Sequence, residues 1–148
     1  MDSKTIVLSA LRSQGAADAT ALQNNADNMT GTQLHDEAQK IPEFNNEKQY
    51  LNYKIGFVCK SKLGNVVRLI QPYDSLIYPQ QPEELVAQWG FKWSTNPEHA
   101  KPFLKSATSP YMKDECCLFE ENVYASTMDN NVYSPAEYPA GWVKVGKE

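Results

Sequence analysis

The sequence predicts a small α+β protein that is mainly β: an N-terminal helical arm over residues 1–43, a first β module over 44–104 and a second over 105–148. The distribution of aromatic residues is the first observation, because only Phe44 and Tyr50 of the 16 fall in the first 50 positions. Beyond Tyr50, short runs rich in β-branched and aromatic residues alternate with turn residues, which is typical of strands. A length of 148 residues suits one domain or two very small ones.

The arm begins with a predicted helix. Ser3 can cap this helix and Gly15 can end it. Its apolar residues recur at helical spacing: Ile6, Val7, Ala10 and Leu11. Residues 16–29 contain only Leu22 and Met29 as large apolar groups, so this stretch can be helical but buries little surface by itself.

A second helix is predicted after Thr30, which has the spacing of a capping box with Gln33. Its apolar stripe consists of Leu34, Ala38 and Ile41, and Pro42 stops the helix. Two interpretations of the arm have equal weight. It is a helical lead-in packed on the same chain, or an oligomerising or docking arm, since helices with thin apolar stripes need a partner surface.

Two hairpins are predicted in the aromatic part. The first pairs residues 57–59 with 66–70, and the second pairs 115–119 with 122–126 around Glu120-Glu121. They look like copies of each other, with these matches: Tyr53 with Tyr111, Val58 with Cys116, Cys59 with Cys117, and Asn65-Val66 with Asn122-Val123. Each copy continues through a proline-containing loop to a tryptophan, Trp89 or Trp142. We expect Trp142–Val145 to form a closing strand, and Trp89 and Trp93 to lie in the core.

Charge and motif content exclude several classes of protein. The net charge is −4 with no block of five like charges, which argues against a nucleic-acid or polybasic membrane partner. No apolar run could span a bilayer, and the start lacks the apolar stretch of a secretory signal. The carboxylate pairs at 114–115 and 120–121 suit solvated hairpin charge, and no nucleophile–base or phosphate-binding motif occurs. We expect no enzyme activity.

Cysteine and histidine usage predicts neither a metal site nor a cofactor. Three cysteines cannot form a paired disulfide framework, and no Cys-x-x-Cys occurs. The two histidines, His35 and His99, lie 64 positions apart, whereas zinc needs four clustered ligands. We therefore expect Cys59, Cys116 and Cys117 to be reduced and partly buried, with the adjacent pair on opposite faces of a strand.

The run from Tyr111 to Val145 contains ENVYASTMDNNVYSPAEYPAGWVKV. It resembles the small carbohydrate-binding modules of family 5/12, the chitin-binding type, in which a hairpin, a proline-containing loop and a late tryptophan build a compact fold. From about residue 5 to 145 the chain resembles a group of small phage or prophage tail-region proteins. The motifs that carry this resemblance are Lys40-Ile41-Pro42, Leu69-Ile70-Gln71-Pro72, Trp89-Gly90, Pro97 to Pro102, Met112 to Cys116, and the final P-x-x-W.

The resemblance implies a carbohydrate-binding surface on the second module. In such modules aromatic rings stack on the apolar face of a pyranose while amides hydrogen-bond its hydroxyl groups. The residues that suit this role are Tyr124, Tyr133, Tyr138, Trp142, Asn130 and Asn131. Trp142 also has a competing interpretation as a core residue, which we favour. The first module has Val67 and Arg68 where the second has Tyr124 and Ala125, so it is expected to serve as a scaffold.

The resemblance also implies a role. We expect a non-catalytic virion protein, made in the host bacterial cytoplasm, that attaches the tail, a fibre or the head to host-surface or mucosal polysaccharide. Its other partners would be virion proteins. Because one weak site gains avidity through multivalency, we expect a homo-oligomer, with a trimer favoured, held partly by residues 3–41. The alternatives are a purely structural virion subunit with no glycan ligand, and a domain that delivers a separate cell-wall hydrolase.

Overall fold

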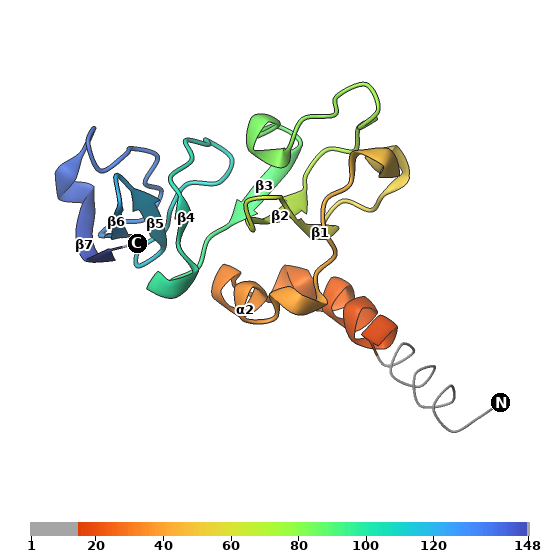
Figure 1. The fold of residues 1–148 in the computed structure, drawn as a ribbon, viewed down its shortest axis with the longest axis horizontal. Helices are drawn as coiled ribbons and strands as arrows, with labels where there is room; N and C mark the ends of the chain where they lie inside the picture. Colours follow the sequence, from red (N-terminus) through yellow and green to blue (C-terminus); the bar gives the residue numbers. More distant parts are fainter. Residues whose placement is uncertain (1–14, 148) are drawn as a thin grey trace.

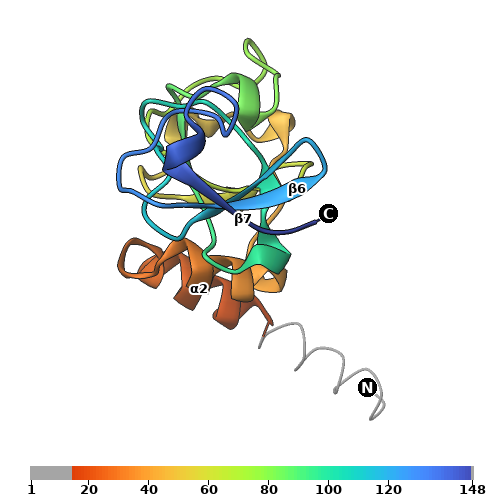
Figure 2. The ribbon, with the colours of Figure 1, turned by 90° about the vertical axis from the view of Figure 1, so that its left-hand side faces the viewer.

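Two β-sheets lie beside each other in the computed structural model, which describes residues 15–147 (Figure 1). The N-terminal helical segment runs along one side of them. Figures 1 and 2 both place this segment, coloured orange, on the side of the sheets opposite the green loop that follows the second strand. The chain is therefore an α+β protein that is mainly β, as the sequence predicts. No helix within the described residues is long and apolar enough to cross a membrane.

The first sheet has three antiparallel strands in the order β1-β2-β3: β1 Val58–Lys60, β2 Val66–Leu69 and β3 Trp89–Lys92. The second has four strands in the order β4-β5-β6-β7: β4 Lys101–Pro102, β5 Cys116–Phe119, β6 Asn122–Ser126 and β7 Trp142–Lys147. β4 runs parallel to β5, and the other neighbours are antiparallel. Both predicted hairpins and the predicted closing strand are confirmed. β4 pairs with the second sheet although it lies before residue 105, where the sequence places the second module's start.

Helical structure is confined to short pieces. A helix covers residues 15–25 of the described chain, and α2 covers Gly31–Asp36. The 3₁₀ turns are η1 Ala26–Asn28, η2 Ala38–Lys40, η3 Asn46–Lys48, η4 Tyr50–Asn52, η5 Pro82–Glu84, η6 Pro97–His99 and η7 Pro139–Gly141. Because Gly15 is itself helical, the prediction that it ends a helix is wrong. Alanines at 16, 17, 19 and 21 favour helix strongly enough to support helical structure from Gly15 onward. The predicted stripe of Ile6, Val7 and Leu11 lies outside the described residues.

The capping box at the start of α2 is confirmed. The Thr30 hydroxyl accepts a hydrogen bond from the Gln33 N–H at 3.1 Å, and the Gln33 side chain accepts one from the Thr30 N–H at 2.8 Å. The helix then ends at Asp36 and continues as a separate 3₁₀ turn at 38–40, rather than as one helix up to Pro42. The change of direction still allows Leu34 and Ile41 to share one apolar cluster.

The described part of the arm packs on its own chain. Leu34 and Ile41 are buried against Val58 and Val66 of the first sheet. The side chain of Gln23 brackets Val58, accepting from its N–H at 2.9 Å and donating to its carbonyl oxygen at 2.7 Å. These contacts correspond to the lead-in interpretation. They also remove Leu34 and Ile41 from any surface through which residues 3–41 could hold a trimer.

A glycine fixes how closely α2 approaches the sheet. A β-carbon on Gly31 would lie 2.0 Å from the backbone oxygen of Trp93, so no other residue fits without moving the helix. Next to it, the Thr32 hydroxyl lies 2.8 Å from the Thr95 hydroxyl and accepts the Thr95 N–H at 2.9 Å. The helical segment is thereby joined to the connection between the two sheets.

The internal repeat extends to the pairing around each hairpin. Before β1, the Phe44 N–H donates to the Lys60 carbonyl at 2.7 Å; before β5, the Phe103 N–H donates to the Leu118 carbonyl at 2.9 Å. Gly56 precedes the first hairpin with φ +98, and Asp114 precedes the second with φ +74. Gly56 and Asp114, which are 58 positions apart, thus both have a positive φ although their side chains differ.

The protein has two halves, the first built around the three-stranded sheet and the second around the four-stranded sheet. Each half contains a Phe–Tyr–Trp triad. In the first half the Phe44 ring stacks on Tyr50 at 5.5 Å between centroids, and Tyr50 meets Trp89 edge-on at 5.2 Å. In the second half the corresponding distances are 5.6 Å for Phe103–Tyr111 and 5.2 Å for Tyr111–Trp142.

The tyrosine of each triad also has the same hydrogen bond. The Tyr50 hydroxyl accepts from the Asn45 N–H at 2.9 Å, and the Tyr111 hydroxyl accepts from the Leu104 N–H at 3.2 Å. The ring that corresponds to Tyr111 is therefore Tyr50, not the Tyr53 that sequence matching selected.

One aromatic core joins the two halves. Trp89 and Trp93 are buried, as predicted. Trp93 stacks on Phe91 of the first half at 5.4 Å and on Tyr111 of the second at 4.4 Å. The adjacent cysteines point to opposite faces of β5, as predicted: Cys117 enters this core and Cys116 a smaller cluster behind it.

Candidate functional site

The loop before β7, residues 127–141, is organised by a buried asparagine. The Asn131 side chain donates to the Ser126 hydroxyl at 3.1 Å and to the Gly141 carbonyl at 2.9 Å, and it accepts from the Tyr133 N–H at 3.1 Å. Its backbone forms an isolated bridge with Tyr111. Asn131 is fully buried. It holds the loop together and is not available to a ligand, which corrects its place among the predicted sugar-binding residues.

Trp142 is also buried, which agrees with the favoured interpretation of this residue as part of the core. Its ring is 6% exposed and meets Tyr111 edge-on, and its Nε1–H donates to the backbone carbonyl of Tyr133 at 2.9 Å. Because this bond uses the main chain of Tyr133, the Tyr133 ring takes no part in it. Trp142 is therefore removed from the predicted binding surface, but it positions a residue that belongs to that surface.

Tyr133 and Tyr138 form an exposed pair. Their rings are 45% and 43% exposed, with centroids 5.8 Å apart and planes inclined at 72°. A β-carbon on Gly141 would come within 2.9 Å of the Tyr138 ring, so the glycine allows this ring to lie close to the loop backbone. The two faces make a corner rather than the flat platform that the resemblance implies. Such a corner can stack one sugar ring on one tyrosine and contact its edge with the other.

A reciprocal cap fixes the turn between the two tyrosines. The Glu137 N–H donates to the Ser134 hydroxyl and the Ser134 N–H to the Glu137 carboxylate, both at 3.1 Å. Lys105 forms an ion pair with the same carboxylate at 3.0 Å. The hydrogen bond from Ser134, followed by the Lys105 amine, lowers the pKa of Glu137. The turn is thus held in place before any ligand arrives, which reduces the ordering cost of binding.

The remaining predicted residues lie apart from this pair. Asn130 is exposed at a turn with φ +55, and its N–H contacts the Met112 sulfur at 3.3 Å. Tyr124 is half-buried on β6, where its ring meets Phe119 and packs on the shared aromatic core. The structure therefore brings together Tyr133 and Tyr138, leaves Asn130 on the same loop, and places Tyr124 on strand β6 against the aromatic core.

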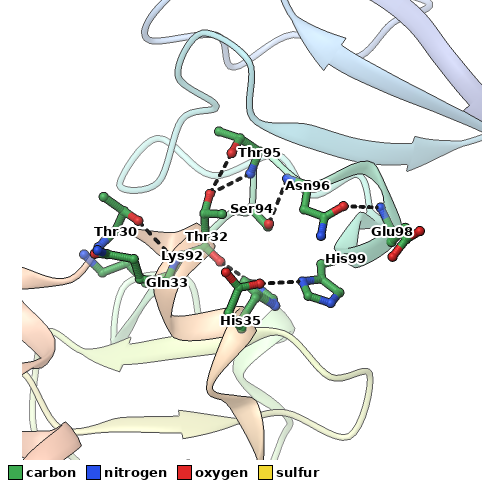
Figure 3. Close-up of polar contacts among 11 residues, drawn as sticks. Thr30, Thr32, Gln33, His35, Lys92, Ser94, Thr95, Asn96, Glu98 and His99 are labelled. Carbon is green, nitrogen blue, oxygen red and sulfur yellow. Dashed lines mark hydrogen bonds and ion pairs between the residues drawn. The ribbon is translucent and has the colours of Figure 1, made fainter.

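A second polar cluster joins the two histidines that the sequence keeps 64 positions apart (Figure 3). The rings of His35 and His99 are stacked at 6.0 Å. His35 Nε2 bonds the Lys92 carbonyl at 2.8 Å, and His99 Nδ1 lies 3.6 Å from the Asp36 carboxylate. Burial lowers the pKa of His35. Among residues 15–147 no group of three or more His, Cys, Asp and Glu side chains could hold a metal ion.

The thiols are poor nucleophiles. All three cysteines are free and buried. Burial raises the pKa of Cys116 to about 11 and that of Cys117 to about 12, and it raises the pKa of Cys59 further. At neutral pH these groups stay protonated, and the thiolate is the reactive form.

Sequence reasoning missed an exposed apolar loop in the first half. Leu76, Ile77 and Tyr78 are each more than half exposed. Asp74 begins this loop, because its carboxylate accepts the Leu76 N–H at 2.9 Å. The signal was an Asx turn, Asp74-Ser75, ahead of three consecutive apolar residues and a proline.

The sequence matches no protein-family model and no curated protein.

Proposed function

We propose that the protein is a non-catalytic virion component that binds polysaccharide through Tyr133 and Tyr138. The single observation that carries this is the exposed tyrosine corner on a loop whose backbone is fixed by Asn131, Trp142 and the Ser134–Glu137 cap. Tyrosine provides apolar stacking area and a hydroxyl donor at a low cost in side-chain entropy, which suits sugar rings.

The setting as a phage or prophage virion protein, on the tail, a fibre or the head, rests on the sequence resemblance. A homo-oligomer remains part of the proposal, because several weak sites on one particle would act together. Its contacts would have to exclude Leu34 and Ile41, which are buried within the chain.

A purely structural virion subunit is the second candidate. The exposed Leu76, Ile77 and Tyr78 favour it, because three adjacent apolar side chains on a fixed loop suit a protein partner better than a sugar. In that case the tyrosine corner would also face another virion protein, and no glycan would bind.

A glycan array on the full chain, followed by titration of the best ligand, tests the proposal. Tyr133→Ala and Tyr138→Ala should each weaken binding by about 1–3 kcal/mol, by analogy with aromatic stacking on other flat ligands. Both variants should unfold within about 0.5 kcal/mol of the parent, since exposed rings contribute little to stability.

Tyr78→Ala is the matched control, because Tyr78 is an exposed tyrosine in the loop of the first half. It should leave glycan binding unchanged. If the parent binds no polysaccharide on the array, or if Tyr78→Ala weakens binding as much as the two loop variants, the tyrosine corner is not a sugar site.

A further inference from the structure

A polar groove lies on the first half and shares no residue with the tyrosine corner. It consists of two adjoining hollows of about 400 Å³ and about 260 Å³, both lined by Glu43, Phe44 and Gln81. The first hollow is also lined by Asn45, Asn46 and Lys48, and the second is also lined by residues 60–62. From the sequence, the first module is expected to serve only as a scaffold.

Backbone pairing fixes one wall of this groove. Residues 42–44 lie alongside β1, because the Lys60 N–H donates to the Pro42 carbonyl at 2.8 Å and the Phe44 N–H returns to Lys60 at 2.7 Å. The Gln81 side chain closes the other wall by accepting the Lys62 N–H at 3.0 Å.

The loop after β2 closes one end of the groove. The Asn46 amide donates to the Pro79 carbonyl at 3.3 Å, and the buried Ser75 hydroxyl donates to the Asn46 carbonyl at 2.6 Å. Both walls and this end are therefore formed before any ligand arrives.

The charge of the groove is opposite to that of the protein. The chain has a net charge of −4, yet the groove is lined by three lysines, Lys48, Lys60 and Lys62, and one carboxylate, Glu43. None of these four side chains forms an ion pair within residues 15–147, whereas Lys40 and Lys105 are paired with glutamates. Three unpaired amines around one groove create a local positive potential.

The other lining groups are those that recognise hydroxyl-rich ligands. Asn45 and Gln81 use their side-chain oxygens on backbone N–H groups, and their amide NH₂ groups bond nothing else in the described chain. Phe44 is half-buried and offers part of a ring. Amide donors beside an aromatic ring suit a sugar, and the lysines add a requirement for negative charge.

We propose that this groove binds an acidic polysaccharide segment, with Lys48, Lys60 and Lys62 contacting its carboxylate or phosphate groups. The inference takes its ligand class from the proposed function, but it assigns a second site with different chemistry. One chain would then hold an acidic stretch on the first half and an apolar sugar face on the second. The two sites share no lining residue, so each is expected to bind independently of the other.

Binding to defined polymers tests this on the full chain. The probes are polygalacturonate, its fully methyl-esterified form, poly(glycerol phosphate) and a duplex DNA of similar charge. The native protein should bind polygalacturonate or poly(glycerol phosphate), and the tighter of the two identifies the anionic group. Replacing Lys48, Lys60 and Lys62 by Gln together should weaken binding by about tenfold or more, and added salt should weaken the native interaction.

A second triple variant, in which Lys113, Lys144 and Lys147 are replaced by Gln, is the matched control. These exposed lysines lie on the second half, and the variant has the same net charge as the groove variant. It should bind within about twofold of the parent.

Any of four results would overturn the proposal that the groove binds an acidic polysaccharide. They are no binding of either acidic polymer, binding of the methyl ester as tight as that of polygalacturonate, binding of DNA as tight as or tighter than that of the acidic polymers, and equal losses of affinity in the two triple variants. Tyr133→Ala separates this test from the proposed function, because it should leave binding of the acidic polymer within about twofold.

Discussion

Trp89 and Trp142 occupy the same place in their sheets, yet the loops before them satisfy the indole N–H in different ways. Trp89 Nε1–H donates to the hydroxyl of Tyr73, and this bond draws the Tyr73 ring into the core. Trp142 Nε1–H donates to the backbone carbonyl of Tyr133, so the Tyr133 ring stays at the surface. When the indole N–H donates to a main-chain carbonyl instead of a tyrosine hydroxyl, it keeps its hydrogen bond and the tyrosine ring is left at the surface. A shared scaffold can carry different surfaces in this way.

The largest expected effect is the loss of folding stability when either tryptophan is removed. It tests whether Trp89 and Trp142 stabilise their sheets to a similar degree. Trp89→Ala and Trp142→Ala should each destabilise the protein by about 3–5 kcal/mol, because each removes the largest buried ring of a triad. Trp89→Ala should cost more, since Trp89 is fully buried whereas Trp142 is 6% exposed. Urea denaturation of the two variants measures the difference. A loss below about 1 kcal/mol for Trp142→Ala would show that the second triad does not support its sheet.

Removing the tyrosine hydroxyl from each triad tests whether the two triads are structurally equivalent. Tyr50→Phe and Tyr111→Phe each take the acceptor from a backbone N–H, of Asn45 and Leu104 respectively. Each should cost about 1–2 kcal/mol, and the two losses should be similar. Tyr53→Phe is the control and should cost less than about 0.5 kcal/mol, because no hydrogen bond to its hydroxyl occurs within the described residues. Unequal losses at 50 and 111, measured by urea denaturation, would break the equivalence.

The paired positions before the hairpins give a smaller effect of opposite sign. Gly56→Ala should destabilise by about 1 kcal/mol, since φ +98 is unfavourable for a residue with a β-carbon. Asp114→Gly should stabilise by up to about 1 kcal/mol, because it removes that cost at φ +74. Thermal unfolding of both variants checks the signs. If Asp114→Gly is also destabilising, the carboxylate has a role that its backbone position does not explain.

The smallest expected effect is a pH dependence at the junction of the helical segment. Burial lowers the pKa of His35 in the folded state below its value of about 6.5 in the unfolded chain. The unfolded chain then binds more protons, so stability is greatest above pH ~6.5 and falls as the pH decreases toward the folded-state pKa. His35→Gln should show a smaller loss between pH 7.5 and 5.5 in urea denaturation. The groups facing this ring are His99, Asp36, Lys101 and the Lys92 carbonyl.

His99→Gln serves as the comparison for that measurement, because it removes the stacked neighbour but keeps His35. It should retain more of the pH dependence than His35→Gln. An identical pH profile in the parent and in His35→Gln would contradict the assignment of the effect to His35.

Patterns within a few residues were predictable because their causes are local. The capping box at Thr30, the two hairpins and the closing strand at Trp142 follow from hydrogen-bonding side chains, turn residues and alternation. The sequence also placed Trp89 and Trp93, which flank Gly90 after a predicted helical turn, in the core. It missed the helix over residues 15–25, where alanine propensity outweighs a single glycine.

Tertiary structure decided which of the predicted site residues face solvent. Asn131 and Trp142 suit a sugar by chemistry, but both are buried, because the loop needs an amide to join its ends and the sheet needs a ring beneath it. Tyr50 rather than Tyr53 takes the place of Tyr111, since turns of different length bring different residues to the same point. The pairing of His35 with His99 and the lysine-lined groove join residues from segments far apart in the chain. Local propensity determined the elements, and the packing of two sheets and a helical segment around one aromatic core determined the surfaces.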